Sequence, residues 1–92
     1  MFTLKQIEKI SADAATKNMS VNFHLTTGEV ITDTEVIKHK IDFSRDRHIG
    51  EILRIDAVTK DNILCKQYFI PFQNIIMITT GRCPLNASSK NL

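Results

Sequence analysis

The sequence predicts a mostly β domain in which one N-terminal helix precedes a strongly bent, five-stranded antiparallel sheet resembling a small barrel. The first observation is a change of period: apolar residues recur with helical spacing over residues 3–17 and then alternate in short runs over residues 20–80. The second is the length of 92 residues. In so short a chain, a flat sheet with one helix would leave a face and both edges exposed. We therefore expect one domain over residues 1–80, followed by a flexible tail over residues 81–92.

The helix is expected over residues 3–17. Thr3 and Gln6 have the spacing of a capping box, which marks a helix N-terminus. Phe2 and Ile7 have the spacing of a hydrophobic staple across the same turn. One helical face then collects the apolar residues Leu4, Ile7, Ile10 and Ala14. Asn18 is a plausible end of the helix.

The first two strands are expected on either side of a turn at Gly28. The first has a clear period of two, since Val21, Phe23 and Leu25 alternate with polar residues. The second is expected to be long, ending near Phe43. A polar patch at residues 32–35 predicts a bend or bulge within it.

The remaining strands follow a polar loop at residues 44–48. In the third strand one face carries Leu53, Ile55 and Ala57. A short turn at residues 60–62 leads to the fourth strand, whose apolar residues are Ile63, Cys65 and Phe69. Pro71 is expected to end that strand because it donates no backbone hydrogen bond. A tight turn at residues 71–74 and a short apolar fifth strand at residues 75–79 complete the domain.

The composition argues against several functional classes of protein. A formal net charge of +2 is too weak to indicate a non-specific nucleic-acid binder, which carries a concentrated Lys/Arg stripe. Cys65 and Cys83 are too few for a disulfide scaffold and match no zinc spacing. Because no apolar run has the length of a signal peptide or a membrane span, we expect a cytoplasmic protein without a membrane partner.

Catalysis, metal binding and cofactor binding have no recognisable signature here. We find no nucleophile with its base, no carboxylate pair and no glycine-rich phosphate loop, and the chain has only 3 Gly and 3 His. His24 is expected at the surface or an interface, and Cys65 is expected as a small core residue. The sequence therefore predicts a protein that is not an enzyme and holds neither a metal nor a cofactor.

One segment carries a motif. Ile70, Asn74, Ile75 and Ile78 fall at the aliphatic and Asn positions of the second Sm motif, and residues 21–43 are similar to the first Sm motif in their strand, their turn at Gly28 and their long second strand. Asp33 stands where that first motif commonly has Gly. The chain thus resembles the Sm-like family, although strand periodicity alone leaves SH3-like and OB-like barrels open.

The resemblance implies an assembly. Sm-like subunits form rings in which the fourth strand of one subunit pairs with the fifth strand of its neighbour, and we expect a cyclic homo-oligomer of about five to seven copies of this chain. A fifth strand that is apolar on both faces fits this expectation, because a free apolar edge invites aggregation. The expected interface residues are Phe69, Ile70, Ile75, Ile76, Met77 and Ile78.

The resemblance also implies a single-stranded RNA site, built from the loop between the second and third strands and from the Arg-Gly of the second motif. Here Pro71 and Phe72 replace that Arg-Gly, so the main cationic group is missing. The expected RNA-binding residues are Arg45, Arg47, His48, Phe72, Gln73 and Asn74.

Each of these residues has a structural alternative. The Arg45 to His48 loop is otherwise a solvated loop with an internal Arg–Asp pair. Phe72 either stacks a base or plugs the core at a turn, and Asn74 either reads a base edge or bonds its own backbone. Two functions follow: a homo-oligomeric ring that binds single-stranded RNA, and a protein-interaction or assembly module of the same fold that has lost RNA binding.

Overall fold

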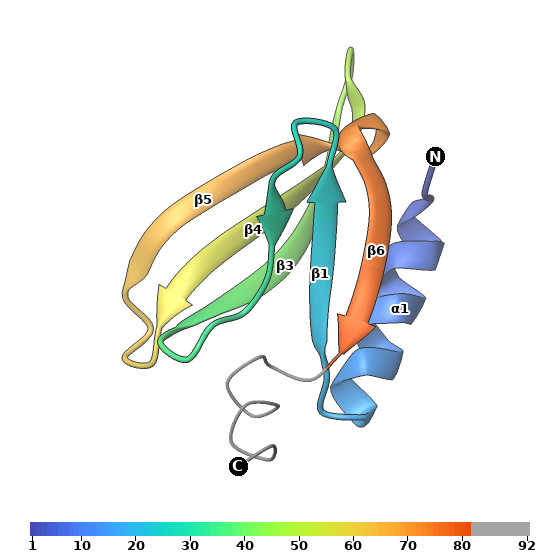
Figure 1. Ribbon diagram of the computed structural model, residues 1–92. Coiled ribbons are helices and arrows are strands. Elements are labelled where there is room, and N and C mark those ends of the chain that lie inside the picture. Colours follow the sequence, from blue (N-terminus) through green and yellow to red (C-terminus); the bar gives the residue numbers. More distant parts are fainter. Residues whose placement is uncertain (82–92) are drawn as a thin grey trace.

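The computed structural model describes residues 1–81, and apart from Gly81 the predicted tail lies outside the described residues. The described part is mostly β with one N-terminal helix, as predicted (Figure 1). In chain order its elements are helix α1 (Leu4–Thr16), strands β1 (Ser20–Leu25), β2 (Val30–Ile31), β3 (Ile37–Asp46), β4 (Gly50–Thr59) and β5 (Leu64–Pro71), the 3₁₀ turn η1 (Phe72–Asn74) and strand β6 (Ile75–Gly81).

The strands form two antiparallel three-stranded sheets rather than one sheet of five strands. Sheet A has the order β2-β1-β6 and sheet B the order β3-β4-β5. The predicted count of five strands is wrong because the second predicted strand is divided into β2 and β3, one in each sheet. The sheets do not close into a barrel, but β2 and β3 are joined by only residues 32–36, which is where the sequence predicts a bend.

Local hydrogen bonds explain why the strand is interrupted there. The Thr34 N–H donates to the Ile37 carbonyl at 2.9 Å, and the Ile37 N–H donates to Thr34 Oγ1 at 3.0 Å. The Asp33 carboxylate accepts a hydrogen bond from the His39 N–H at 2.8 Å. Short polar side chains thus satisfy backbone groups that a continuous ladder would otherwise pair.

Helix α1 has the predicted N-terminus. Gln6 Oε1 accepts from the Thr3 N–H at 2.9 Å, and Thr3 Oγ1 accepts from the Gln6 N–H at 3.2 Å, which is a complete capping box. The helix ends at Thr16, and Asn18 follows with a φ of 55°, the left-handed conformation common after helices. This helix is too short and too polar to cross a membrane.

The core lies between the helix and the two sheets. Helix α1 packs against β1 and contributes the fully buried Ile7. The buried set is completed by Phe23, Leu25, Ile31, Leu53, Ile55, Ile70, Phe72 and Ile75. The predicted inward faces of the first and third strands are confirmed, because Phe23, Leu53 and Ile55 are almost completely buried.

The predicted inward face of the fourth strand is wrong. Ile70 is buried and Tyr68 packs against the core, whereas Ile63, Cys65 and Phe69 are exposed. Cys65 is therefore not a core residue. Side chains alternate along a strand, so a shift by one residue exchanges the two faces. The pairing of Leu53 with Ile70 fixes the observed choice.

The β3–β4 hairpin is longer than predicted. Residues 44–48 were expected to form a loop, but β3 continues through Asp46 and β4 begins at Gly50, with Arg45 paired to Glu51 across the strands. Figure 1 shows this hairpin projecting beyond the rest of the domain. A polar sequence forms strands here because both faces of the projecting tip are in water.

Candidate functional site

The site is a pocket between the β3–β4 hairpin tip, the η1 turn and the N-terminus. We call it the Arg47 pocket; its volume is about 530 Å³. It is lined by Met1, Phe2, Thr3, Arg45, Asp46, Arg47, Ile49, Gly50, Glu51 and Gln73. Of the residues predicted from the sequence, the structure brings together Arg45, Arg47 and Gln73.

The hairpin tip is ordered by Asp46. Its Oδ1 accepts hydrogen bonds from the His48 N–H at 2.8 Å and from the Ile49 N–H at 3.0 Å. These bonds, that from Ile49 first, hold the pKa of the Asp46 carboxyl below its ordinary value of 3.8. Gly50, with a φ of 95°, supplies the left-handed backbone that begins β4. The tip is therefore a defined turn, and it fixes the backbone positions of Arg45 and Arg47.

The two arginines have different partners. Arg45 donates to Glu51 Oε1 at 2.9 Å, but the Arg45 side chain is 77% exposed, so water screens this pair. The alternative of an internal Arg–Asp pair is not what forms, because Arg45 pairs with Glu51. Within residues 1–81, Arg47 has no carboxylate within ion-pair distance. Arg47 is thus a cation of this pocket that is available to an anionic ligand, although the Asp46 and Glu51 carboxylates line the pocket as well.

Three other predicted residues do not line the pocket. Phe72 is only 3% exposed and packs edge-to-face on Phe43, with ring centroids 6.4 Å apart. It fits the core-plug alternative, since stacking a base would require the core to open. The Asn74 carbonyl accepts from the Thr26 N–H at 2.9 Å, and the His48 side chain is exposed on the tip.

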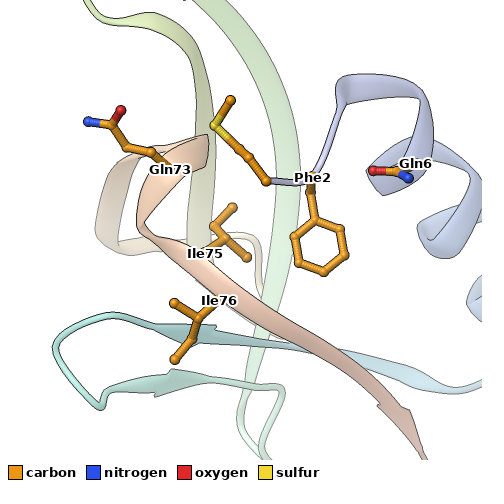
Figure 2. A pocket seen from close by; sticks show the side chains of 6 residues that line it. Phe2, Gln6, Gln73, Ile75 and Ile76 are labelled. Atoms are coloured by element: carbon orange, nitrogen blue, oxygen red, sulfur yellow. The ribbon is translucent and has the colours of Figure 1, made fainter.

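An adjoining pocket lies between the helix N-terminus and β6. We call it the Phe2 pocket; its volume is about 530 Å³, and it is lined by Met1, Phe2, Gln6, Gln73, Ile75 and Ile76. Figure 2 shows the Phe2 ring between Gln6 on the helix side and Ile75 on β6. Gln73, Met1 and Phe2 line both pockets. The N-terminal residues were not among the predicted site residues, because the capping box predicts where the helix starts but not which part of the domain that end contacts.

The residues predicted for a subunit interface divide into two groups. Ile70 and Ile75 are buried in the core, and Ile78 packs against it. Phe69 is 62% exposed on β5, while on β6 Ile76 is 62% and Met77 48% exposed. β5 and β6 are also edge strands, one in each sheet. Two unpaired strand edges therefore carry exposed apolar side chains.

Two of the three histidines contact other polar side chains. His24 Nε2 lies 3.0 Å from Thr79 Oγ1, and His39 Nδ1 lies 3.2 Å from Asp33 Oδ1. Among residues 1–81, no cluster of His, Cys, Asp and Glu has the geometry to hold a metal ion. Cys83 lies outside the described residues.

Comparison with protein-family models, curated proteins and solved structures finds no match to this chain. Its function has to be inferred from the chemistry of the sites. The Arg47 pocket combines a free guanidinium, an exposed amide at Gln73 and an aromatic ring at Phe2. In other proteins, groups of these three kinds bind phosphate, a base edge and a base face respectively.

Proposed function

We propose that this chain is an Sm-like subunit that assembles into a cyclic homo-oligomer and binds single-stranded RNA in the Arg47 pocket. One observation carries the proposal. The hairpin tip and the η1 turn are the two segments that the resemblance to Sm proteins implies for RNA binding, and Arg47 and Gln73 from these segments line the same pocket.

The topology supports the Sm-like part of the proposal. β2 and β3 are consecutive and joined by residues 32–36, so the two separate sheets would correspond to the two arms of the bent sheet of an Sm fold. β6 and β5 are then the two ends of that sheet. They correspond to the predicted fifth and fourth strands, which the resemblance implies as partners between neighbouring subunits.

The faces of the two free edges are compatible with such pairing. On β5, Phe69 lies opposite Arg54 and adjoins the buried Ile70, so it belongs to the outer face. On β6, Met77 lies opposite His24, on the face turned away from Phe23. If β5 of one subunit pairs with β6 of the next, Phe69 and Met77 share one face and cover each other. Pairing would also satisfy the free backbone groups of both edges.

The RNA part rests on charge and on exposed polar groups. Arg47 is exposed and lies on a turn that Asp46 orders, so binding a phosphate costs little rearrangement. Gln73 is exposed on η1 and presents both a donor and an acceptor to a base edge. In a ring, every subunit would repeat this pair, and the repeated weak contacts would add through effective concentration.

The second candidate is an assembly module of the same fold without RNA binding. Three observations favour it. Phe72 lies in the core and cannot stack a base, and Arg45 already has a carboxylate partner in Glu51. The cationic residue of the second Sm motif is replaced by Pro71. In this candidate β5 of one subunit still pairs with β6 of the next, but the Arg47 pocket binds no nucleic acid.

The test is RNA binding by fluorescence anisotropy with short labelled homopolymers of each base, at salt concentrations from about 50 to about 200 mM. We expect binding that weakens as salt rises, because phosphate contacts release counterions. Arg47→Ala should lower the affinity by about tenfold, whereas Lys9→Ala, which removes an exposed cation from the helix, should leave it unchanged.

Light scattering on the same samples separates the candidates. A mass of several chains together with Arg47-dependent binding supports the ring that binds RNA. The same mass with no RNA binding supports the assembly module. RNA binding with equal losses in both variants contradicts the assignment of RNA to the Arg47 pocket. A monomer contradicts both.

A further inference from the structure

A cleft that shares no residue with the Arg47 pocket or the Phe2 pocket lies at the other end of sheet B, away from the hairpin tip. We call it the Tyr68 cleft; its volume is about 340 Å³. It is lined by Val30, Ile31, Thr32, Thr34, Ile37, His39, Ala57, Cys65, Lys66 and Tyr68. These residues come from β2, the bend after it, and β3, β4 and β5. The volume is at the lower end of the range of small-molecule sites, roughly 300–1,000 Å³.

The strand register shows that this cleft is the end of the core face. Ile41, Ile55 and Tyr68 lie opposite one another across the three strands, and this row packs into the core. The next row on the same face is His39, Ala57 and Lys66. A face that is apolar along most of its length thus becomes cationic where it opens to solvent. A lysine on that face is not explained by packing of the core.

The polar groups of the cleft are arranged around the tyrosine ring. Lys66 Nζ lies over the Tyr68 ring, 4.7 Å from its centroid, so a base that stacks on this face displaces the exposed lysine head. The His39 ring lies 6.4 Å from the Tyr68 ring at an interplanar angle of 49°. Asp33, which does not line the cleft, fixes the His39 ring through Nδ1 at 3.2 Å. This contact leaves Nε2 of the same ring without a partner among the described residues.

Lys66 is the one Lys or Arg of the lining and favours an anion, whereas His39 contributes a ring N–H or nitrogen beside the Asp33 carboxylate. Lys66 and His39 are the only ionisable side chains of the lining other than Cys65 and Tyr68, and no Asp or Glu lines this cleft. An aromatic wall beside a cation binds a flat ring that carries a negative group. A free phosphate or sulfate would use the cation but not the Tyr68 face or the apolar residues of β2.

We propose that the Tyr68 cleft binds a nucleotide, with the base against Tyr68 and the phosphate at Lys66 and His39. This site is separate from the Arg47 pocket: His39 and Arg45 are six residues apart on β3, about 20 Å along an extended strand. The proposal does not depend on the ring or on the Arg47 pocket. The nucleotide is either free or part of an RNA strand, and the experiment distinguishes the two sources.

Binding at this site can be followed by the intrinsic fluorescence of the protein. Tyr68 is the only tyrosine, and the chain has no Trp. Intrinsic tyrosine fluorescence therefore reports the cleft alone. We expect adenosine monophosphate to quench it saturably, after correction for absorbed light with free tyrosine. Adenosine and inorganic phosphate should each bind at least about tenfold more weakly, because each lacks one of the two recognised groups.

Variants assign the binding by calorimetry with adenosine monophosphate. Lys66→Gln should weaken binding about tenfold, while Lys9→Gln on the helix should not change it. Tyr68→Phe keeps a ring and should retain binding, whereas Tyr68→Leu should lose it. Lys66 is exposed, so Lys66→Gln remains informative even if Tyr68→Leu does not fold.

The Arg47→Ala variant is used to distinguish a free nucleotide from a nucleotide within an RNA strand. In this variant, tighter binding of a single-stranded oligoadenylate than of the mononucleotide supports a strand in the cleft, and the reverse supports a free nucleotide. The proposal is overturned if the mononucleotide does not quench Tyr68, if inorganic phosphate competes equally well, or if Lys66→Gln and Lys9→Gln behave alike. Loss of RNA binding in Arg47→Ala with intact quenching would concern the Arg47 pocket alone.

Discussion

Asp33 and His39 are joined twice across the bend between the two sheets. The Asp33 Oδ1 atom accepts a hydrogen bond from the His39 N–H at 2.8 Å and lies 3.2 Å from Nδ1 of the His39 ring. Both side chains are mostly buried, at 21% and 12% exposure. This pair connects the segment after β2 to the start of β3, at the point where the chain passes from sheet A to sheet B.

We expect Asp33→Ala to destabilise the domain by about 1–3 kcal/mol, since it leaves a backbone donor and an imidazole without their acceptor. Asp33→Asn keeps an acceptor oxygen and should cost less. Urea unfolding followed by circular dichroism measures both. Glu35→Ala, an exposed change in the same bend, serves as the control. Equal midpoints for Asp33→Ala and Glu35→Ala would show that the pair does not hold the bend.

The hairpin tip should respond to acid through Asp46. Its folded pKa lies below 3.8, so the ionised carboxylate stabilises the tip at pH above the unfolded value. That stabilisation should disappear as the pH falls through the folded pKa. Hydrogen exchange of the His48 and Ile49 amides between pH ~2 and ~6 measures it. Asp46→Asn should remove the acid transition, and Asp61→Asn in the β4–β5 turn should not. A transition unchanged in Asp46→Asn would assign it to another group.

The core depends on large side chains that are shielded from solvent. Leu53 is fully buried between sheet partners, so Leu53→Ala should lower the free energy of unfolding by about 2–5 kcal/mol through lost burial and a cavity. Val36→Ala, at a residue that is 60% exposed, should change it by less than about 0.5 kcal/mol. Thermal unfolding of the two variants compares them directly. Similar melting temperatures would contradict the assigned core.

The two free strand edges should control assembly. Phe69→Lys places a charge on the exposed face of β5 and should reduce the mass measured by light scattering to that of a single chain. The monomer should remain folded, because Phe69 does not belong to the core. Val36→Lys introduces the same charge at a similarly exposed residue on neither edge, and should leave the mass unchanged. A lower mass in both variants would exclude the β5–β6 pairing as the specific contact.

Much of the fold was predictable because its signals are local. The capping box of Thr3 and Gln6, the alternation of Phe23 and Leu25, and the turn at residues 71–74 were predicted from neighbouring residues and are confirmed. The prediction failed where the local alternation of residues allowed either face of a strand to point into the core. Residues 63–69 alternate weakly, and the wrong face of β5 was chosen.

The candidate site was only partly predictable. Arg45, Arg47 and Gln73 were predicted as site residues and do line one pocket. For Phe72 the sequence left two roles open, stacking on a base or filling the core at a turn. The environment of Phe72 depends on Phe43, which is distant in the chain. No spacing in the sequence reports that contact.

The sequence by itself determined the helix, its start and its end, the alternation of the first and third strands, and the bend at residues 32–35. Each of these depends on period, capping or turn chemistry within a few residues. Only the tertiary structure decided that the bend divides the strands between two sheets, that Phe69 faces outward, and that the N-terminus reaches Gln73 and Arg47. The physical reason is that burial and pocket formation depend on which distant segments pack together, and that choice minimises the free energy of the whole chain rather than of any one segment.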